Sequence, residues 1–173
     1  QHGARIDLEA AAGIGRLDVV KTLFDGAGNL AASATSCEME RGFLWACEYG
    51  RDDVVDFLLQ RGVPVQTQAG TGQTGLHWAV IGAHLNTINL LLGRGAPLEA
   101  KNVYGATALG QALWSAFSTG KRVDYLPVIE VLLKAGARIE DGFREWLSEQ
   151  EPVQSPVKDR IIAMLNRSQT TAD

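Results

Sequence analysis

A chain of 173 residues with 46% hydrophobic and 21% charged side chains has the composition of a folded globular protein and not of a disordered one. Its net charge of −4 argues against a nucleic-acid partner, because proteins that bind phosphate backbones normally carry basic patches. No apolar run approaches the roughly 18–20 residues that span a bilayer, so no membrane partner is expected.

Two cysteines are too few for a disulfide framework, which favours a reducing compartment, and we expect a cytoplasmic protein. Because the chain begins with Gln1 and not with methionine, we expect a processed form or a fragment, from which a targeting signal could have been removed. We expect residues 1–173 to form a single domain and to act as a monomer.

The sequence repeats itself with a period of 33 residues. A fixed period of this size indicates stacked units, because each unit alone cannot bury its apolar face. Nine positions recur in this way, and only one pair differs in residue type. The pairs are Gly42/Gly75, Phe43/Leu76, Trp45/Trp78, Ala46/Ala79, Leu58/Leu91, Leu59/Leu92, Arg61/Arg94, Gly62/Gly95 and Pro64/Pro97.

Four units are predicted along the chain. The first aligns with the second at an offset of 35, and the following units begin at Arg41, Thr74 and Thr107. We expect approximate repeats at 5–38, 39–71, 72–104 and 105–141, a C-terminal helical cap at 142–166 and a frayed tail at 167–173.

Each unit is predicted to contain two helices. The first helix has apolar residues at i, i+3 and i+4, as in Phe43, Ala46 and Cys47, and Thr74 and Thr107 stand at its expected N-cap. The second helix is expected to follow a short polar capping residue and to end at a glycine in the left-handed conformation. These residues are Asp18, Asp52 and Asn86 at the start, and Gly62, Gly95 and Gly136 at the end.

The fourth unit and the C-terminus depart from the period. An eight-residue insertion at roughly Ser115 to Asp124 contains Phe117, Lys121 and Arg122, which could make a second contact, although Phe117 could instead extend the first helix. The cap is expected to be an irregular helix pair that closes the apolar core. Its apolar residues are Phe143, Trp146, Leu147, Val157, Ile161, Ile162, Met164 and Leu165.

The segment Gly72-Gln-Thr-Gly-Leu-His-Trp-Ala-Val80, followed by His84 and by Gly95-Ala-Pro-Leu-Glu-Ala-Lys-Asn102, resembles an ankyrin repeat. The resemblance implies an all-α solenoid of stacked helix-turn-helix units with short β-hairpin fingers, here four repeats plus a C-terminal cap. It also implies a concave surface that usually binds other proteins. By the same resemblance, His77 satisfies a hydrogen bond at a helix start and His84 bridges the turn between helices.

Three positions depart from the family pattern. Gly75 stands where proline is usual, Arg41 replaces the threonine in the second unit, and Gly110 replaces the histidine in the fourth. Some hydrogen-bond networks of the first helices are therefore expected to be missing.

Helical geometry predicts an aromatic strip opposite the core. Two positions along a helix rotate by about 200°, so Trp45 faces away from the core if Phe43 is buried. Stacking would place the equivalent residues on one continuous strip, which we interpret as a recognition groove, although the rings could instead pack on each other. The expected partner-binding surface comprises Trp45, Glu48, Tyr49, Trp78, Ile81, Gln111, Trp114, and the finger residues Gln68, Glu99, Lys101 and Tyr104.

Other motifs favour structural interpretations. Gly70 to Gly75 matches a dinucleotide-binding loop but lacks the flanking βαβ unit. His77 and His84 lack the further ligands that zinc requires, and Cys47 occupies a core position unsuited to a nucleophile. No cofactor, metal or catalytic residue is therefore predicted.

The sequence thus favours a non-enzymatic module that binds a protein or peptide partner. Two alternatives remain open. The chain could be the regulatory or targeting domain of a larger enzyme, or the tryptophan strip could bind a small ligand.

Overall fold

The computed structural model describes residues 6–118, 123–140, 142–143, 145–146 and 156–169. Within this part the regular structure is helical, without a β-strand. The chain divides into two compact units, Gln1–Pro97 and Leu98–Asp173. In the first unit, the predicted fingers are turns closed by single antiparallel bridges, Phe24 with Leu30 and Gln68 with Thr74, and not paired strands.

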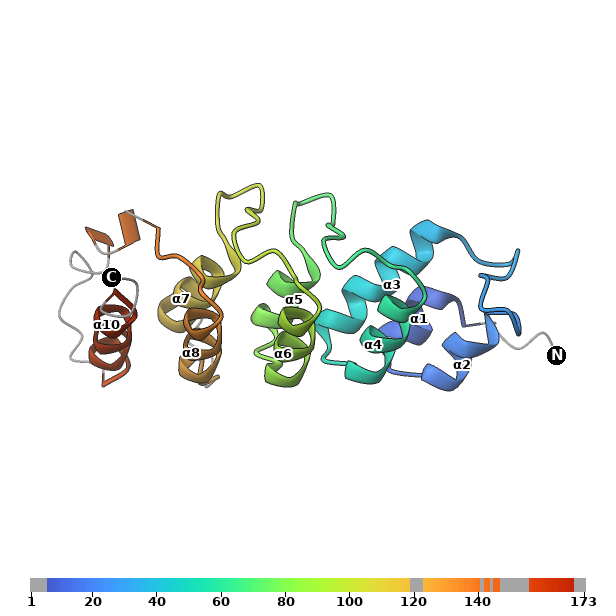
Figure 1. The fold of residues 1–173 in the computed structure, drawn as a ribbon, viewed down its shortest axis with the longest axis horizontal. Helices are drawn as coiled ribbons and strands as arrows, with labels where there is room; N and C mark the ends of the chain where they lie inside the picture. Colours follow the sequence, from blue (N-terminus) through green and yellow to red (C-terminus); the bar gives the residue numbers. More distant parts are fainter. Residues whose placement is uncertain (1–5, 119–122, 141, 144, 147–155, 170–173) are drawn as a thin grey trace. The chain divides into compact units, whose positions relative to one another are not determined.

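The first unit consists of three helix pairs. One helix of each pair packs on its counterpart in the next, α1 on α3 and α3 on α5, while α2, α4 and α6 pack in a second row (Figure 1). The helices are α1 (Leu8–Gly13), α2 (Leu17–Thr22), α3 (Ser36–Glu48), α4 (Asp52–Gln60), α5 (Gly75–Ile81) and α6 (Leu85–Gly93).

Glycines allow the first-row helices to approach closely. A Cβ atom on Gly42 would lie 2.7 Å from Leu8 Cδ2, and one on Gly75 would lie 2.9 Å from Cys47 Sγ. Real Cβ atoms essentially never come this near to a neighbour. The two recurring glycines therefore set the spacing of α1, α3 and α5.

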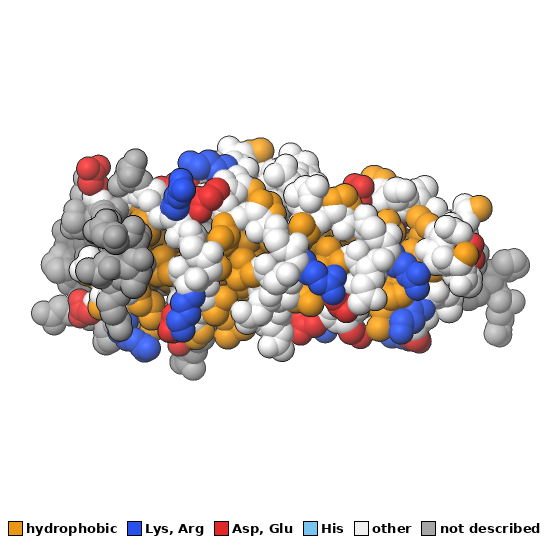
Figure 2. Space-filling model, viewed as in Figure 1, with side chains coloured by type: hydrophobic (Ala, Val, Ile, Leu, Met, Phe, Trp, Pro, Cys, Tyr) orange, Lys and Arg blue, Asp and Glu red, His pale blue; other side chains and the backbone are white. Residues whose placement is uncertain are grey.

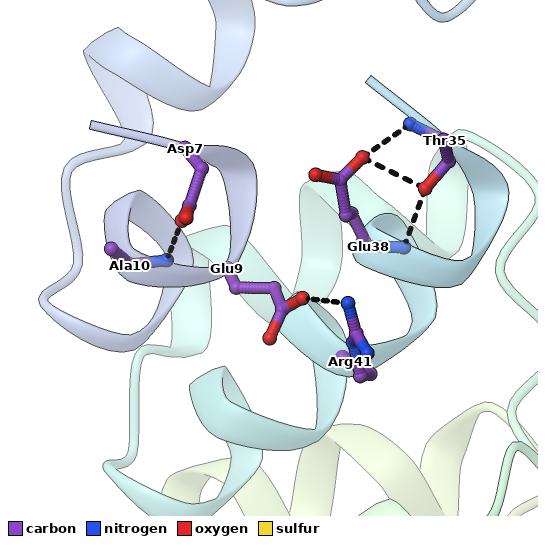
Figure 3. A network of polar contacts seen from close by, with 6 residues as sticks. All are labelled: Asp7, Glu9, Ala10, Thr35, Glu38 and Arg41. Atoms are coloured by element: carbon purple, nitrogen blue, oxygen red, sulfur yellow. Dashed lines mark hydrogen bonds and ion pairs between the residues drawn. The ribbon is translucent and has the colours of Figure 1, made fainter. Parts of the chain in front are cut away.

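Helix α3 begins earlier than the repeat alignment predicted. Its N-cap is Thr35, whose hydroxyl accepts a hydrogen bond from the Glu38 N–H at 3.2 Å, while the Glu38 carboxylate accepts one from the Thr35 N–H at 2.7 Å (Figure 3). This is a capping box, in which two orphan donors of a helix end are satisfied reciprocally. Arg41, aligned above with the capping threonines, instead lies inside α3 and pairs with Glu9 of α1.

The predicted caps of the first helices are confirmed. Thr74 and His77 form a capping box at α5, with the Thr74 N–H 3.2 Å from His77 Nδ1. In the second unit the Thr107 hydroxyl accepts a hydrogen bond from the Gly110 N–H at 3.1 Å. The His77 imidazole, which accepts a hydrogen bond from the Thr74 N–H, has no counterpart in the second unit, because Gly110 stands at the equivalent position.

The predicted caps of the second helices are wrong. Asp18, Asp52 and Asn86 lie inside the first turns of α2, α4 and α6, and none of these helices has a side-chain cap. The backbone closes the preceding turns directly, as in the 2.8 Å bond from the Arg51 N–H to the Ala46 carbonyl. Asp52 instead accepts a hydrogen bond from the Thr87 hydroxyl at 2.5 Å, which joins α4 to α6.

In the second unit, α8 (Leu126–Lys134) packs against both α7 (Ala108–Ser118) and α10 (Pro156–Gln169). Ile161 and Leu165 of α10 are buried, in agreement with a helical cap. Helix α10 continues three residues beyond the point where the frayed tail was expected to start. The side chains of Leu147 and Val157, predicted in the cap, lie outside the described residues.

At the predicted insertion α7 is longer than its counterpart, with 11 residues against 7 in α5. Phe117 lies in this extension and packs edge-to-face on Trp146, with ring centroids 5.6 Å apart. Lys121 and Arg122 lie outside the described residues. Of the two interpretations of Phe117, the structure supports the extended helix.

Gly62, Gly95 and Gly136 have φ values of 93°, 77° and 93°, which confirms the predicted left-handed residues after α4, α6 and α8. Among the described residues, no helix has both the length and the apolar character that crossing a membrane requires.

Candidate partner-binding surfaces

Helix α3 separates a buried face from an exposed aromatic face. Phe43, Ala46 and Cys47 are fully buried, whereas Trp45 and Tyr49 keep 42% and 47% of their surface exposed. Phe43 and Trp45 are two positions apart, which is the rotation that turns a side chain to the opposite side of a helix. The two aromatic rings therefore face solvent because the core needs the other face of α3.

Trp45 and Tyr49 form a single aromatic plate. Their rings are stacked with centroids 5.9 Å apart and planes within 7° of parallel. They line a hollow of about 500 Å³, together with Ala10 and Gly13 of α1. The hollow exists because these small residues of α1 leave the space beside the rings unfilled.

The charged groups around this hollow are largely engaged. Glu9 pairs with Arg41, and Arg51 Nε donates a hydrogen bond to the Gly13 carbonyl at 3.1 Å. The Asp7 carboxylate accepts from the Ala10 N–H at 2.8 Å and caps α1 (Figure 3). These contacts hold the rim of the hollow in place beside the aromatic plate.

On α5 the residues of the predicted aromatic strip are less exposed than those on α3. Trp78 and Ile81 are half-buried, and Trp78 Nε1 is screened from solvent without a hydrogen-bond acceptor. Trp78 occupies the same repeat position as Trp45, yet its ring is less accessible. We therefore name as the α3 aromatic plate only Trp45 and Tyr49.

Glu48, the last residue of α3, directly precedes Tyr49. Its side chain is half-buried, and burial raises the pKa of its carboxyl group. Its carbonyl oxygen accepts a hydrogen bond from His84 Nε2 at 2.9 Å, so this ring nitrogen carries a proton. His84 thus connects successive repeats, whereas the resemblance implied a contact within one turn.

The predicted finger residues are exposed, but two of them have partners. Gln68 and Tyr104 are exposed, with 81% of the surface of Tyr104 accessible. Glu99 accepts a hydrogen bond from the Arg138 N–H at 2.9 Å, and Lys101 Nζ lies 3.2 Å from Glu140 Oε1. The loop that carries Gln68 projects beyond the helices of the first unit (Figure 1).

The second unit holds a cavity of about 650 Å³ that the sequence did not predict. Tyr104, Gln111 and Trp114 of the predicted surface line it. Trp114 is 55% exposed, whereas Gln111 is half-buried and donates to the Ser115 hydroxyl at 3.1 Å. Further lining residues, which sequence reasoning missed as site residues, are Asn102, Glu140, Phe143 and Trp146.

The sequence did contain one signal for this cavity. Gly110, which stands in the position of His77, lines it, and a Cβ atom there would approach nothing nearer than 3.5 Å. The absent imidazole leaves space between the finger and α7. We name this hollow, with its lining residues, the second-unit cavity.

The residues considered above for zinc or catalysis have structural contacts. His77 is fully buried in the capping box of α5, and the described residues contain no group of three or more possible metal ligands. Burial raises the pKa of the Cys47 thiol well above its usual range, which suppresses the reactive thiolate. In the Gly70–Gly75 segment, the Gly72 N–H donates to the Ala69 carbonyl at 2.8 Å within a tight turn.

Exposed apolar side chains also occur elsewhere. On the face drawn in Figure 2, hydrophobic side chains reach the surface between polar ones over the helices of the first unit. Such scattered exposure is normal for soluble proteins. The aromatic plate and the second-unit cavity differ because several large rings lie together beside a hollow.

Comparisons with known proteins agree with this architecture. The family model described as ankyrin repeats (3 copies) matches residues 43–142, which include helices α4 to α8 and the C-terminal part of α3. A comparison with curated proteins gave no match. Ankyrin repeats are generally protein–protein interaction modules and are typically without enzymatic activity. The stacked helix pairs, the recurring glycines and the match over more than half of its length show that this chain belongs to the ankyrin repeat family.

Proposed function

We propose that this chain is a non-enzymatic module that binds a segment of a protein partner on the exposed surface of its first-row helices and fingers. In the first unit, the contact is centred on the α3 aromatic plate. The observation that carries the proposal is the stacked, exposed pair Trp45 and Tyr49 beside an unfilled hollow of about 500 Å³. Trp and Tyr are enriched among the residues that dominate binding energy in protein interfaces.

The geometry suits an inserted side chain. Because the two rings stack on each other, each already restricts the rotamers of the other, which lowers the conformational entropy lost when a partner covers them. Glu48, which precedes Tyr49 in the sequence, and the exposed Gln68 of the finger before α5 offer further polar groups to a partner. The two free cysteines, one exposed and one buried, fit the proposed location in a reducing compartment such as the cytoplasm.

Selection of peptides from a displayed random library tests the proposal. We expect the selected peptides to bind the wild type and to lose about 30-fold or more in affinity on Trp45→Ala, which corresponds to about 2 kcal/mol. Ile162→Ala in α10 is the matched control, because Ile162 is an apolar side chain of similar exposure at 37%. If the selected peptides bind Trp45→Ala and the wild type equally well, the plate is not the binding surface.

A further inference from the structure

The second-unit cavity combines aromatic walls with a carboxylate. Tyr104, Trp114, Phe143 and Trp146 contribute rings, and Glu140 is the one charged residue among the described residues that line the cavity. We propose that this cavity binds a basic side chain, arginine or lysine, presented by a segment of the protein partner. The proposal deepens the proposed function and rests on it, because it names the chemistry of the partner at a second place.

The aromatic walls suit a cation with an apolar stem. A guanidinium or ammonium group is attracted to the face of an aromatic ring, and more strongly to Trp than to Tyr or Phe. The rings of Phe143 and Trp146 lie 5.3 Å apart and are inclined by 34°, so they form a bent wall. With Trp114 only partly covered, a long side chain can enter beside it.

Glu140 supplies the complementary charge. Its Oε1 is screened from solvent and accepts no aligned hydrogen bond, although Lys101 Nζ lies 3.2 Å away. The Lys101 side chain is 58% exposed, and ion pairs at such sites contribute little to stability. An entering cation can therefore displace Lys101 at small cost and take its place at the carboxylate.

Asn102 favours a peptide over a bare cation. Its residue is only 6% exposed, and its Oδ1 accepts hydrogen bonds from the N–H groups of Tyr104 and Ala106, both at 3.0 Å. This arrangement fixes the orientation of the amide and leaves Nδ2 as a buried donor without an acceptor. Because Asn102 lines the cavity, a peptide carbonyl that enters with the basic side chain would supply the acceptor.

Because Gly110 has no side chain, it leaves space for the ligand in the second-unit cavity. Since the nearest atom to an added Cβ is Thr107 Oγ1 at 3.5 Å, a side chain at this position would fit without a clash and would fill part of the cavity. A larger side chain there should block the ligand while leaving α7 intact. This gives a variant that separates binding from folding.

The experiment uses the peptide acetyl-Ala-Arg-Ala-amide and its citrulline counterpart, which differ by the positive charge. Binding is followed through the indole N–H signals of Trp114 and Trp146 in NMR spectra of the whole chain, assigned with Trp→Phe variants. We expect the arginine peptide to shift both signals at about 1 mM, and the citrulline peptide to bind about tenfold more weakly. Equal affinities, or no shift of either signal, would overturn the proposal.

Three substitutions sharpen the result. Glu140→Gln should weaken binding of the arginine peptide several-fold, Gly110→Leu should abolish it, and Lys101→Met should strengthen it because a competing cation is removed. Circular dichroism checks that Gly110→Leu is folded. If it is not folded, Trp114→Ala, which removes an exposed wall, replaces it. Unchanged binding in the folded blocking variant, or weaker binding in Lys101→Met, contradicts the proposal.

Trp45→Ala keeps the two proposals separate. It removes the α3 aromatic plate, and we expect it to leave the arginine peptide bound to the second unit. Equal binding of the selected peptides to Trp45→Ala and to the wild type would contradict only the proposed function of the first unit, whereas absence of the Trp114 and Trp146 shifts with the arginine peptide would contradict only the cavity proposal.

Discussion

Gly42 of α3 lies directly against Leu8 of α1, so that a methyl group on Gly42 would stand 2.7 Å from Leu8 Cδ2 and 3.2 Å from Ala12 Cβ. The Gly42→Ala variant should therefore force the two helices apart. We expect a loss of about 1–3 kcal/mol in unfolding free energy, which is the usual cost of overpacking a core. This loss outweighs the gain of up to about 1 kcal/mol that alanine brings to a helix.

Gly93→Ala is the matched control in the same unit. Gly93 is the last residue of α6, and a Cβ atom there meets nothing within 4 Å. We expect this variant to be neutral or slightly stabilising in urea denaturation. Equal stabilities for the two variants would mean that α1 and α3 accommodate the extra methyl group without being forced apart.

A second prediction concerns Ala83, which is in the left-handed region with φ of 55°. Gly15 and Gly50 occupy the same position of the earlier repeats, with φ of 79° and 63°. Because the left-handed conformation costs an alanine about 1–2 kcal/mol, Ala83→Gly should stabilise the protein by about 0.5–1 kcal/mol after the extra entropy of glycine is counted.

The reverse substitution tests the same reasoning. A Cβ atom on Gly50 would lie 2.5 Å from His84 Nδ1, so Gly50→Ala combines backbone strain with a clash and should be destabilising. Thermal unfolding monitored by circular dichroism measures both variants. A lower melting temperature for Ala83→Gly would contradict the strain at Ala83.

These positions also show how far the sequence predicts the fold. Phe43 and Leu76 mark buried first-row helices because their apolar spacing recurs with the period, and Gly62 marks a helix end because only a flexible backbone suits that turn. The start of α3 was missed because the Thr35–Glu38 capping box lies outside the repeating part. Asp52 was misassigned as a cap because its carboxylate instead accepts a hydrogen bond from the Thr87 hydroxyl of α6.

The candidate sites likewise contain features that follow from local sequence and features that depend on the tertiary structure. The exposure of Trp45 follows from helical rotation relative to Phe43, a local property. The partial burial of Trp78 depends on its surroundings, which an equivalent position in the repeat does not determine. The second-unit cavity joins Asn102 to Glu140 and Trp146, which lie far from it in the sequence and share no periodic relation with it, so only the structure brings them together.

The third prediction is a pH dependence that arises at Glu48. Burial raises the pKa of its carboxyl group, so folding favours the neutral form. The folded state therefore loses stability as the pH rises through the folded-state pKa, and the Glu48→Gln variant should be more stable than the wild type at pH 7. This advantage should disappear below the ordinary pKa of glutamate, about 4.3.

Urea denaturation at a series of pH values checks this prediction. The effect is expected to be small because the side chain is only half-buried. A Glu48→Gln variant that is less stable at neutral pH would show that the carboxylate makes a favourable contact that outweighs its desolvation.

The last prediction uses the two free cysteines, of which Cys37 is exposed and Cys47 is buried. A thiol-specific disulfide reagent should modify one group rapidly in the native protein, and Cys37→Ser should remove this fast reaction. Cys47 should react only after unfolding, because burial both blocks access and raises the pKa of its thiol.

Since Cys47 Sγ lies where α3 meets Gly75 of α5, its modification reports the opening of that contact. In the Cys37→Ser background, denaturant should therefore accelerate the reaction in parallel with the loss of helical circular dichroism. Rapid modification of Cys47 without denaturant would instead show that α3 and α5 separate while the rest of the first unit stays folded.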